Sequence, residues 1–374
     1  MKIGTPKEIK NHEYRVGLVP SSVRELVHHG HEVYIQTQAG ESIGYSDEIY
    51  KEAGAVILQT AEEIFKIADM IVKVKEPQKS EYALLKKDQI LFTYLHLAPD
   101  PEQAKGLLDS GCVAIAYETV TDNNGGLPLL SPMSEVAGRM SIQVGAHFLE
   151  KEQGGAGVLL GGIPGVLPSN VLILGGGVVG TNAAKMALGM GSKVTIVDRS
   201  LKRLRDLDDI FGGKVETLFS NFENIEKSAI QADLIIGGVL IPGGSAPKLL
   251  KKEILSRMKK GSVVVDVAID QGGCFETSSP TSHANPIYVV DGVIHYCVTN
   301  MPGAVAKTSA QGLNNATLPF IVELANKGYK KALLENHHLM NGLNVMHGML
   351  THQAVSQDLK MESLYKSPAV LLND

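Results

Sequence analysis

Short apolar runs alternate with segments of helical periodicity in the first part of the chain. An apolar run bounded by turn residues is typical of a buried strand, and a repeat of about 3.6 residues is typical of a helix. Their alternation favours a parallel sheet covered by helices. In residues 1–130 the pattern predicts the helix Ser21–His29 and the strands Lys2–Gly4, Glu32–Gln36, Met70–Lys75, Ile90–Leu95 and Cys112–Tyr117.

The middle of the chain repeats this alternation. Strand patterns occupy Val171–Leu174, a segment ending at Asp198, Val215–Phe219, Leu234–Gly238 and Ser262–Ala268. The sequence therefore predicts an α/β fold with two doubly wound parallel-sheet, Rossmann-like domains and a cleft between them. We expect one domain boundary near Leu130 and another near Met301-Pro302-Gly303.

Length and charge narrow the class of protein. A chain of 374 residues is long enough for two or three domains, at roughly 150 residues each. The formal net charge is -5 and charges of both signs are well mixed, so no basic stripe is available for a phosphate backbone and no nucleic-acid partner is expected. No window reaches the about 18 uninterrupted apolar residues of a membrane span, and the N-terminus has no signal-peptide pattern. We expect a soluble cytoplasmic protein without membrane contact.

The cysteines give no framework for a disulfide or a metal. Cys112, Cys274 and Cys297 are far apart in the sequence and none belongs to a C-x-x-C pair. A structural zinc site or a disulfide scaffold needs closely spaced or paired cysteines. We expect the three thiols to be reduced and mostly buried, and we expect no metal site.

A glycine-rich turn in the middle of the chain is the most specific local signal. The segment Val171–Ser200 reads VLILGGGVVGTNAAKMALGMGSKVTIVDRS, a strand followed by a turn, a helix and a second strand. Gly175 permits the tight turn, Gly177 lets a pyrophosphate approach the backbone, and Gly180 lets the helix lie close to the strand. Phosphates would then lie at the helix N-terminus, where unpaired N–H groups favour anions. The alternative is a turn with a purely structural role.

An acidic residue completes this motif. Asp198 ends the second strand, near the spacing expected for a carboxylate that accepts hydrogen bonds from the adenosine ribose. A 2'-phosphate would be repelled by this carboxylate, so the motif favours NAD over NADP.

Three side chains follow predicted strands of the first domain. Arg15 lies in the loop before the first helix, Lys75 ends the strand that begins at Met70, and His96 follows the Ile90 strand. Ligands of open parallel sheets bind beyond the carboxyl ends of the strands, so we expect these three groups on one rim.

Each of the three has a structural alternative. Arg15 could be a solvated loop charge, and His96 could be a buried imidazole bonded to backbone. Lys73 and Lys75 share one face of the predicted strand, so both could line the wet side of an edge strand.

Together the three groups suit a small keto or amino acid. An arginine binds a carboxylate through two hydrogen bonds, a lysine can polarise a carbonyl oxygen, and a histidine can transfer protons near neutral pH. In the second domain, Asp270 follows the strand that contains Asp266 and is a further candidate at the rim. The alternative is a turn aspartate beside Gly272 and Gly273.

The combination of these segments resembles the alanine dehydrogenase family over essentially the whole chain. The stretches that carry the resemblance are GTPKEIKNHEYRVGLVP, VKVKEPQ, FTYLHLAPD, SEVAGRMSIQVGAHFLE, GVLLGGIPGVLPSNVLILGGGVVG, DVAIDQGGCFETS and VTNMPGAVAKTSA. The resemblance implies NAD-dependent, reversible oxidative deamination of L-alanine to pyruvate and ammonia, usually in a homohexamer. It also implies a discontinuous substrate domain, 1–130 with 306–374, around an NAD-binding domain, 131–305, so that a helical segment after Ala306 returns to the first domain.

The resemblance further implies roles for individual residues. His96 and Asp270 would be catalytic, and Arg15 and Lys75 would bind the substrate. Contacts to NAD are implied for Ser134, Gly175, Gly177, Val178, Val179, Gly180, Asp198, Arg203, Ser220, Val239, Leu240, Val267, Ala268, Ile269, Asp270, Val298, Thr299, Asn300 and Met301.

Two other functions remain open from the sequence. One is the nucleotide-binding component of a proton-translocating transhydrogenase, which is similar in fold and sequence. The other is a protein that binds NAD as a structural or signalling group without turnover. Alanine-dependent formation of NADH by the isolated chain would separate both from a dehydrogenase.

Overall fold

The computed structural model describes residues 1–239 and 246–373. The chain divides into two compact units. Unit 1 comprises Met1–Pro132 and Val305–Asp374, and unit 2 comprises Met133–Ala304. Each unit is built on its own sheet, and each sheet is mainly parallel. The predicted α/β fold with two Rossmann-like sheets is confirmed.

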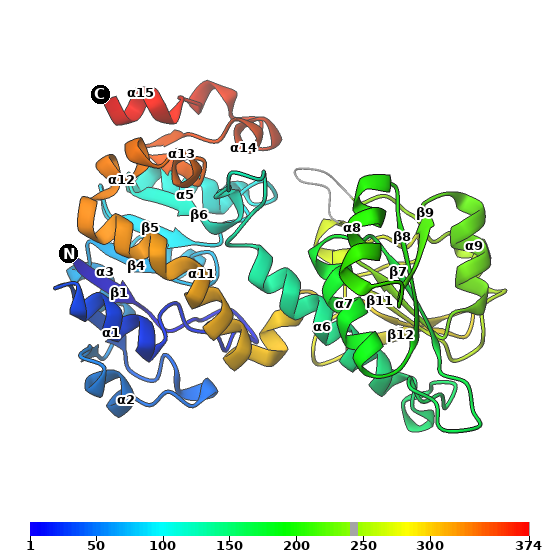
Figure 1. Ribbon diagram of the computed structural model, residues 1–374. Helices are drawn as coiled ribbons and strands as arrows, with labels where there is room; N and C mark the ends of the chain where they lie inside the picture. Colours follow the sequence, from blue (N-terminus) through cyan, green and yellow to red (C-terminus); the bar gives the residue numbers. More distant parts are fainter. Residues whose placement is uncertain (240–245, 374) are drawn as a thin grey trace. The chain divides into compact units, whose positions relative to one another are not determined.

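The sheet of unit 1 has the strand order β15-β14-β6-β5-β4-β1-β2-β3 (Figure 1). Strands β1 to β6 are parallel, whereas β14 and β15 are antiparallel additions at one edge. The strands are β1 (Lys2–Thr5), β2 (Glu32–Gln36), β3 (Val56–Leu58), β4 (Met70–Val72), β5 (Ile90–Thr93), β6 (Val113–Ala116), β14 (Leu343–Met346) and β15 (Met349–Leu350).

Helices cover both faces of this sheet. On one face, α3, α5 and α14 pack against alternate strand residues such as Ile71, Leu91 and Ala114. The helices of unit 1 are α1 (Pro20–His28), α2 (Asp47–Glu52), α3 (Ala61–Ile67), α4 (Lys79–Tyr82), α5 (Pro101–Ser110), α11 (Ala306–Lys327), α12 (Tyr329–Glu335), α13 (His337–Met340), α14 (Gln353–Asp358) and α15 (Pro368–Asn373), with short 3-10 turns η1 (Glu41–Ile43), η2 (Tyr117–Thr119) and η6 (Glu362–Leu364).

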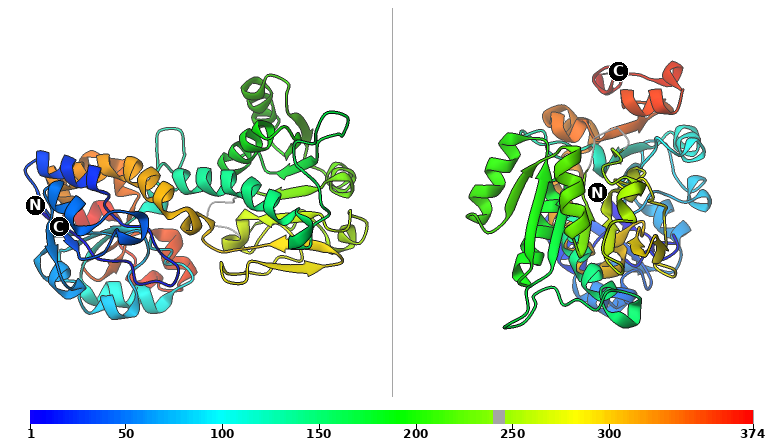
Figure 2. Two further views of the ribbon diagram at one scale, coloured as in Figure 1. Left: turned by 90° about the horizontal axis from the view of Figure 1, so that it is seen from below. Right: turned by 90° about the vertical axis from the view of Figure 1, so that its right-hand side faces the viewer.

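The segment after Ala306 lies against the N-terminal part of the chain within unit 1 (Figures 1 and 2). Asn314 of α11 accepts hydrogen bonds from the backbone N–H of Val19 at 2.9 Å and from the hydroxyl of Ser22 at 2.8 Å. The sequence predicts a helical segment here, and the structure differs in one part: β14 and β15 form a hairpin that pairs with β6. The hairpin supplies the hydrogen-bond partners that the edge of β6 would otherwise lack.

The sheet of unit 2 has the order β12-β13-β11-β10-β7-β8-β9, and only β12 is antiparallel. Its strands are β7 (Asn170–Leu174), β8 (Lys193–Asp198), β9 (Glu216–Phe219), β10 (Leu234–Gly237), β11 (Val263–Asp266), β12 (Ile287–Val290) and β13 (Val293–Tyr296). Its helices are α6 (Ser131–Phe148), α7 (Val178–Gly189), α8 (Leu201–Phe211), α9 (Phe222–Gln231) and α10 (Lys252–Leu255), with 3-10 turns η3 (Lys151–Gln153), η4 (Val267–Gln271) and η5 (Met301–Val305).

The two faces of the unit 2 sheet carry different helices. Leu172 and Leu174 of β7 belong to the core beneath α9 and α10. Ile173 lies between them in the strand and points to the opposite face, where Gly180 of α7 approaches it. Successive side chains of a strand point to opposite faces of the sheet, and here both faces are buried. The continuous apolar run VLIL follows from this.

Several predicted strands are shorter than expected. The largest difference is at β4, which ends at Val72 rather than at Lys75, and β11 ends at Asp266 rather than at Ala268. In both places the chain leaves the sheet to form a loop, so residues assigned to strand ends belong to rim loops instead.

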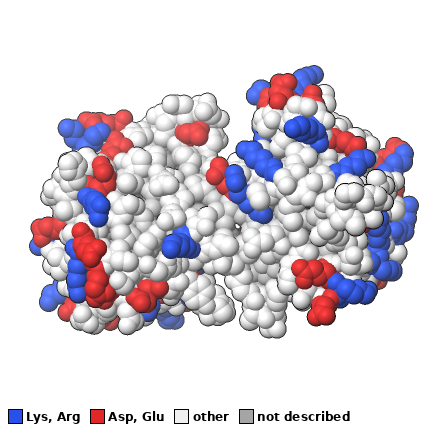
Figure 3. All heavy atoms as spheres, turned by 60° about the horizontal axis from the view of Figure 1, so that its bottom comes forward, with Lys and Arg blue, Asp and Glu red and all other residues white. Residues whose placement is uncertain are grey.

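The thiols and the charged surface have the following properties. All three cysteines are free and buried, as predicted. Lysines and arginines are interspersed with acidic residues on the face seen in Figure 3. Within residues 1–239 and 246–373, no helix is long and apolar enough to cross a membrane, and no cluster of three or more metal-ligating side chains occurs.

Candidate active site

The carboxyl ends of four neighbouring strands in unit 1 carry polar side chains. The strands lie in the order β6-β5-β4-β1. The loop after β1 contains Arg15, the loop after β4 contains Lys75, the chain after β5 contains His96, and η2 after β6 contains Glu118. The three predicted residues therefore follow the carboxyl ends of three adjacent strands.

Arg15 is a buried, ordered cation. Only 2% of the residue is exposed, so the alternative of a solvated loop charge is wrong. Its Nε and Nη2 atoms donate to the two carboxylate oxygens of Glu13 at 2.7 and 2.6 Å. Burial opposes the charge, but the hydrogen bonds and attraction of Glu13 raise the pKa of Arg15 above its usual value. The guanidinium thus keeps its charge and its orientation in a dry environment.

Lys75 lies close to this guanidinium. Burial lowers the pKa of the Lys75 ammonium, and the positive charge of Arg15 lowers it further. The carbonyl of Lys75 accepts a hydrogen bond from the hydroxyl of Thr93 at 2.9 Å. Two cations held together at low exposure create a local demand for an anion, which a substrate carboxylate would meet.

Lys73 has a different environment from Lys75. It is fully buried, and its Nζ atom donates to Glu8 at 3.1 Å and to Glu81 at 3.0 Å. Glu8 also accepts from the backbone N–H groups of Val74 at 2.7 Å and of Lys75 at 3.3 Å. The alternative in which both lysines line the wet side of an edge strand is wrong, because β4 lies between β1 and β5.

His96 projects from a turn just beyond β5. Its backbone φ is +48°, a left-handed conformation that costs a residue with a Cβ atom roughly 1–2 kcal/mol. About half of its side chain is exposed, so the alternative of a buried core histidine is wrong. The imidazole stacks on the ring of Tyr94, with centroids 5.7 Å apart and planes 6° from parallel.

Tyr94 lies against the imidazole of His96 and near the charge of Arg15. The Tyr94 hydroxyl donates to the carbonyl of Leu129 at 2.6 Å. Burial raises the pKa of Tyr94, while the charge of Arg15 opposes that rise. The rings of His96 and Tyr94 are stacked, and the charge of Arg15 acts on both Tyr94 and Lys75, so the four side chains lie near one another at the carboxyl ends of these strands.

Sequence reasoning did not identify the acidic partners of the site. Glu13 orders Arg15, and Glu118 accepts hydrogen bonds from the backbone of Leu95 and His96. Glu118 follows a predicted strand, so the rule applied to His96 would also have found it. Glu13 has no comparable local signal.

In unit 2 the glycine turn has the geometry expected of a phosphate-binding loop. Gly175 has a φ of +100°, which favours glycine. A Cβ atom at Gly180 would lie 1.9 Å from the carbonyl oxygen of Gly175, whereas a Cβ atom at Gly177 would meet no heavy atom within 4 Å. Gly180 thus permits close packing of helix and strand, and Gly177 leaves open space beside the N-terminus of α7. These features fit a dinucleotide.

Asp198 and Arg203 brace this turn. One Asp198 oxygen accepts from the N–H of Gly176 at 2.8 Å, and the other accepts from the N–H of Ser200 at 2.8 Å. Arg203 donates to the carbonyl of Gly176 at 2.6 Å and to the hydroxyl of Thr181 at 2.7 Å. The carboxylate predicted to bind a ribose therefore also holds the glycine turn.

The other residues implied to bind NAD gather at the same edge of the unit 2 sheet. Ser220 follows β9, Val239 follows β10, and its side chain lies beside Gly175. Leu240 lies outside the described residues. The remaining residues are Val178 and Val179 at the start of α7, Val267, Ala268, Ile269 and Asp270 after β11, Val298, Thr299, Asn300 and Met301 after β13, and Ser134 in α6.

Ser134 belongs to a helix that runs close to the glycine turn. One helical turn further along α6, Gly138 lies so near α7 that a Cβ atom there would be 2.3 Å from the carbonyl oxygen of Val179. Arg139 donates to Asn182 at 3.0 Å. Helix α6 is therefore packed closely on the helix that follows the glycine turn.

Asp266 and Asp270 have separate tasks. Asp266 is fully buried and caps η4, because one oxygen accepts from Ala268 N–H at 3.1 Å and the other from Cys274 N–H at 2.8 Å. Burial raises the pKa of Asp266. Asp270 is exposed on the turn that Asp266 supports. The buried aspartate is structural, and the exposed one can meet a ligand.

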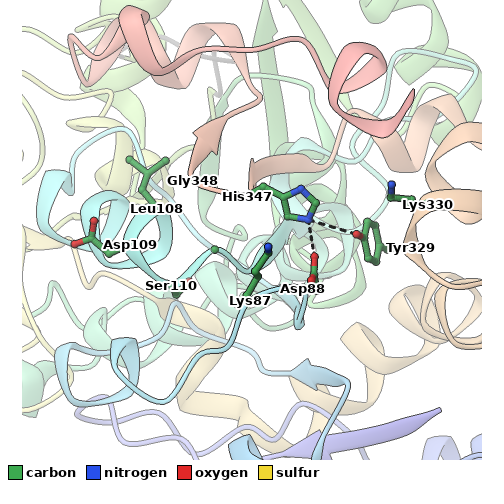
Figure 4. Close-up of a pocket in the computed structure, with 10 residues that line it drawn as sticks. Lys87, Asp88, Leu108, Asp109, Ser110, Tyr329, Lys330, His347 and Gly348 are labelled. Carbon is green, nitrogen blue, oxygen red and sulfur yellow. Dashed lines mark hydrogen bonds and ion pairs between the residues drawn. The ribbon is translucent and has the colours of Figure 1, made fainter. Parts of the chain in front are cut away.

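A hollow in unit 1 lies at the amino-terminal ends of β5 and β6 (Figure 4), whereas His96 follows the carboxyl end of β5. His347 contacts Asp88 at 2.6 Å and the hydroxyl of Tyr329 at 3.5 Å. None of the residues predicted to act on a substrate or cofactor lines this hollow. The Asp88–His347 pair ties the β14–β15 turn to the loop before β5.

Comparison with known proteins identifies the family. Residues 4–137 match the family model described as alanine dehydrogenase/PNT, N-terminal domain, and residues 141–353 match alanine dehydrogenase/PNT, C-terminal domain. The chain belongs to the alanine dehydrogenase/PNT family. The predicted resemblance is confirmed, and so is the expectation of an oxidoreductase with a dinucleotide-binding domain.

Members of the alanine dehydrogenase/PNT family align with nearly the whole chain. The alanine dehydrogenase of Halomonas elongata is 59% identical over 97% of this chain and 98% of its own length. Alanine dehydrogenase 2 of Staphylococcus aureus is 54% identical, with 98% of each chain covered. A solved L-alanine dehydrogenase superposes with a TM-score of 0.94 at 56% identity, covering 96% of this chain and 99% of that one.

A solved transhydrogenase is less similar in sequence. A transhydrogenase from Sinorhizobium meliloti superposes with a TM-score of 0.82, covering 95% of this chain and 100% of that one. Its sequence identity is 22%, so this likeness shows the shared fold alone.

Proposed function

We propose that the protein catalyses the NAD-dependent, reversible oxidative deamination of L-alanine to pyruvate and ammonia. The observation that carries the proposal is the group at the carboxyl edge of unit 1, where Arg15, Lys75 and His96 follow three adjacent strands. Two cations and a proton-transfer group are the chemistry that an amino acid and its keto acid require. The alanine dehydrogenases similar over full length give the same substrate.

We propose NAD as the cofactor of unit 2. The open space at Gly177 would receive the pyrophosphate beside the N-terminus of α7. Asp198 would accept hydrogen bonds from the ribose and would repel the 2'-phosphate of NADP. When bound, NAD would supply the acceptor for the hydride that leaves Cα of alanine.

The residues of unit 1 would bind and orient the substrate. Arg15, fixed by Glu13, would hold the carboxylate, and Lys75 would bind the reacting nitrogen or oxygen. Low exposure of the two cations would exclude water and strengthen both contacts. A positive site would also disfavour a second cation, which suits a substrate whose amine is neutral when it reacts.

His96 would move the protons. After the hydride has left, the substrate is an iminium, and His96 would take a proton from a water molecule as the oxygen bonds to Cα. It would then return that proton to the nitrogen as the C–N bond breaks and ammonia departs, and it would accept the proton of the carbinolamine hydroxyl as the carbonyl of pyruvate forms. Asp270 would help to position the nitrogen or the cofactor.

The proposal is tested by mixing the purified chain with NAD and L-alanine at alkaline pH and following NADH absorbance. We expect alanine-dependent NADH formation, weaker signals with glycine or serine, and a marked preference for NAD over NADP because of Asp198. No alanine-dependent signal would exclude the proposed function. A transhydrogenase component or a binding protein without turnover predicts that negative result.

We also propose that the protein is a homo-oligomer, a hexamer as the resemblance implies. The segment 154–168 contains no charged residue, and it exposes Leu159, Ile163, Val166 and Leu167 by 66%, 60%, 60% and 89%. Contiguous exposed apolar side chains favour a protein interface. We expect light scattering to give the mass of six chains, and replacement of Ile163 and Leu167 by serine to yield smaller species. A monomeric wild-type chain would contradict this.

A further inference from the structure

Glu118 occupies the place where the pairing of β5 with β6 ends. The last paired residues are Thr93 and Ala116. Beyond Thr93 the N–H of Tyr94 donates to the carbonyl of Val74 at 3.2 Å, and the next two N–H groups, of Leu95 and His96, donate to Glu118. The side chain of Glu118 supplies the acceptor in place of the strand.

The contacts of this carboxylate are with backbone rather than with the imidazole. Oε1 accepts from the N–H of His96 at 2.6 Å, and both oxygens are 3.2 Å from the N–H of Leu95. The Nδ1 atom of His96 is 4.0 Å from Oε1, which is too long for a hydrogen bond. A carboxylate that accepts from two consecutive N–H groups forms strong, charge-assisted bonds.

The backbone that Glu118 holds is strained. His96 has a φ of +48°, and residues with a Cβ atom keep such a conformation only when their surroundings enforce it. Strain of this kind is common where a side chain must be aimed. Stacking on Tyr94 then sets the plane of the imidazole.

We propose that Glu118 is a positioning residue for the reaction, in that its carboxylate holds the left-handed turn at His96 and so aims the imidazole at the substrate. The inference rests on the proposed function for the chemistry of His96. Glu118 acts through the backbone of His96 and does not itself touch the substrate. It also faces the partly buried His352, on whose charge it acts.

The kinetic test is a double-mutant cycle. We expect Glu118→Ala to lower kcat by roughly 10- to 100-fold, because a displacement of about 1 Å can cost that much, with the NAD dissociation constant unchanged. Glu118→Gln keeps one acceptor oxygen, so its kcat should lie between those of Glu118→Ala and the wild type. In the His96→Ala background, Glu118→Ala should change kcat by less than about 2-fold, because the residues act as one unit. If the losses of kcat from the two single substitutions multiply in the double variant, the proposal is overturned.

Glu63→Ala is the matched control. The Glu63 carboxylate accepts from two consecutive backbone N–H groups, of Gln59 at 2.8 Å and of Thr60 at 3.0 Å. It belongs to α3, which follows β3, the outermost strand of the same sheet at the end far from β15. We expect this variant to lose some stability and to keep the wild-type kcat. An equal loss of kcat in both variants would mean that Glu118 only stabilises the unit.

A crystal structure of Glu118→Ala gives a result that is independent of activity. We expect His96 to leave the left-handed region and its ring to lose the stack with Tyr94. An unchanged turn would overturn the proposal even if the chain oxidises alanine. Conversely, absence of alanine oxidation by the wild type would overturn the proposed function, while the altered turn would still assign the role of Glu118 in holding His96. If the alanine variant fails to fold, Glu118→Gln in the same cycle decides the question.

Discussion

Replacing His96 with alanine is expected to lower kcat for alanine oxidation by about 10²- to 10⁴-fold, the range that general acid–base catalysis contributes. The half-exposed imidazole is the proton-transfer group at the rim of unit 1, and no neighbour in the described site has the same chemistry. NAD affinity should change little, because the residues proposed to bind NAD belong to unit 2. Steady-state kinetics and fluorescence titration with NADH measure the two effects.

His347→Ala provides the control for that variant. His347 is a second histidine of unit 1 with a carboxylate partner, Asp88 at 2.6 Å, at the amino-terminal ends of the strands (Figure 4). We expect its removal to leave kcat within about 2- to 3-fold of the wild type, since it touches no group of the site. Wild-type turnover by His96→Ala would remove His96 from the mechanism.

Replacing Lys73 with methionine is expected to destabilise unit 1 by about 3–5 kcal/mol, the usual cost of removing one partner from a buried ion pair. Lys73 is fully buried between Glu8 and Glu81, so methionine would leave two buried carboxylates without their cation. Urea and thermal unfolding measure the loss.

The same variant has a distinctive pH dependence. Burial raises the pKa of Glu8, and Lys73 opposes that rise. Without Lys73 the pKa of Glu8 should rise further, so that lowering the pH neutralises the buried carboxylate. The destabilisation should therefore be largest at neutral pH and shrink as the pH falls. A deficit that grows in acid would contradict the assignment.

Lys79→Met is the matched control for Lys73→Met. Lys79 contacts Glu102 at 2.5 Å, but 80% of the lysine side chain is exposed. Water screens an exposed ion pair, which then contributes little to stability, so this variant should unfold much like the wild type. Equal losses from both lysines would show that burial is not the cause.

The sequence predicted the local parts of both units well. Alternating apolar runs and amphipathic segments predict buried strands covered by helices. Both units contain a mainly parallel sheet of this kind. The glycine turn was predicted in detail because φ and steric room at Gly175 and Gly180 are local properties. The positions of Arg15 and His96 after their strands followed from a rule about parallel sheets.

The bounds of strands, the short strand β3 and the two hairpins β12–β13 and β14–β15 were harder to predict. Strand β4 ends at Val72, and beyond it the N–H groups of Val74 and Lys75 donate to the Glu8 carboxylate, while Lys73 still donates to the carbonyl of Phe92. The strands β14 and β15 lie far along the chain from β6, their partner in the sheet. Local periodicity does not report which distant edge a short apolar run will join.

By itself, the sequence determined which residues could perform the chemistry: a guanidinium, an ammonium and an imidazole at strand ends, and a glycine turn with a ribose-binding carboxylate. Only the tertiary structure decided how these groups are held. Glu118 accepts a hydrogen bond from His96, 22 residues away in the sequence, and Glu8 accepts one from Lys73, 65 residues away. The physical reason is that hydrophobic periodicity reports only whether a strand is buried. The strand order β6-β5-β4-β1 results from packing of the whole unit. That order determines which charged side chains become partners.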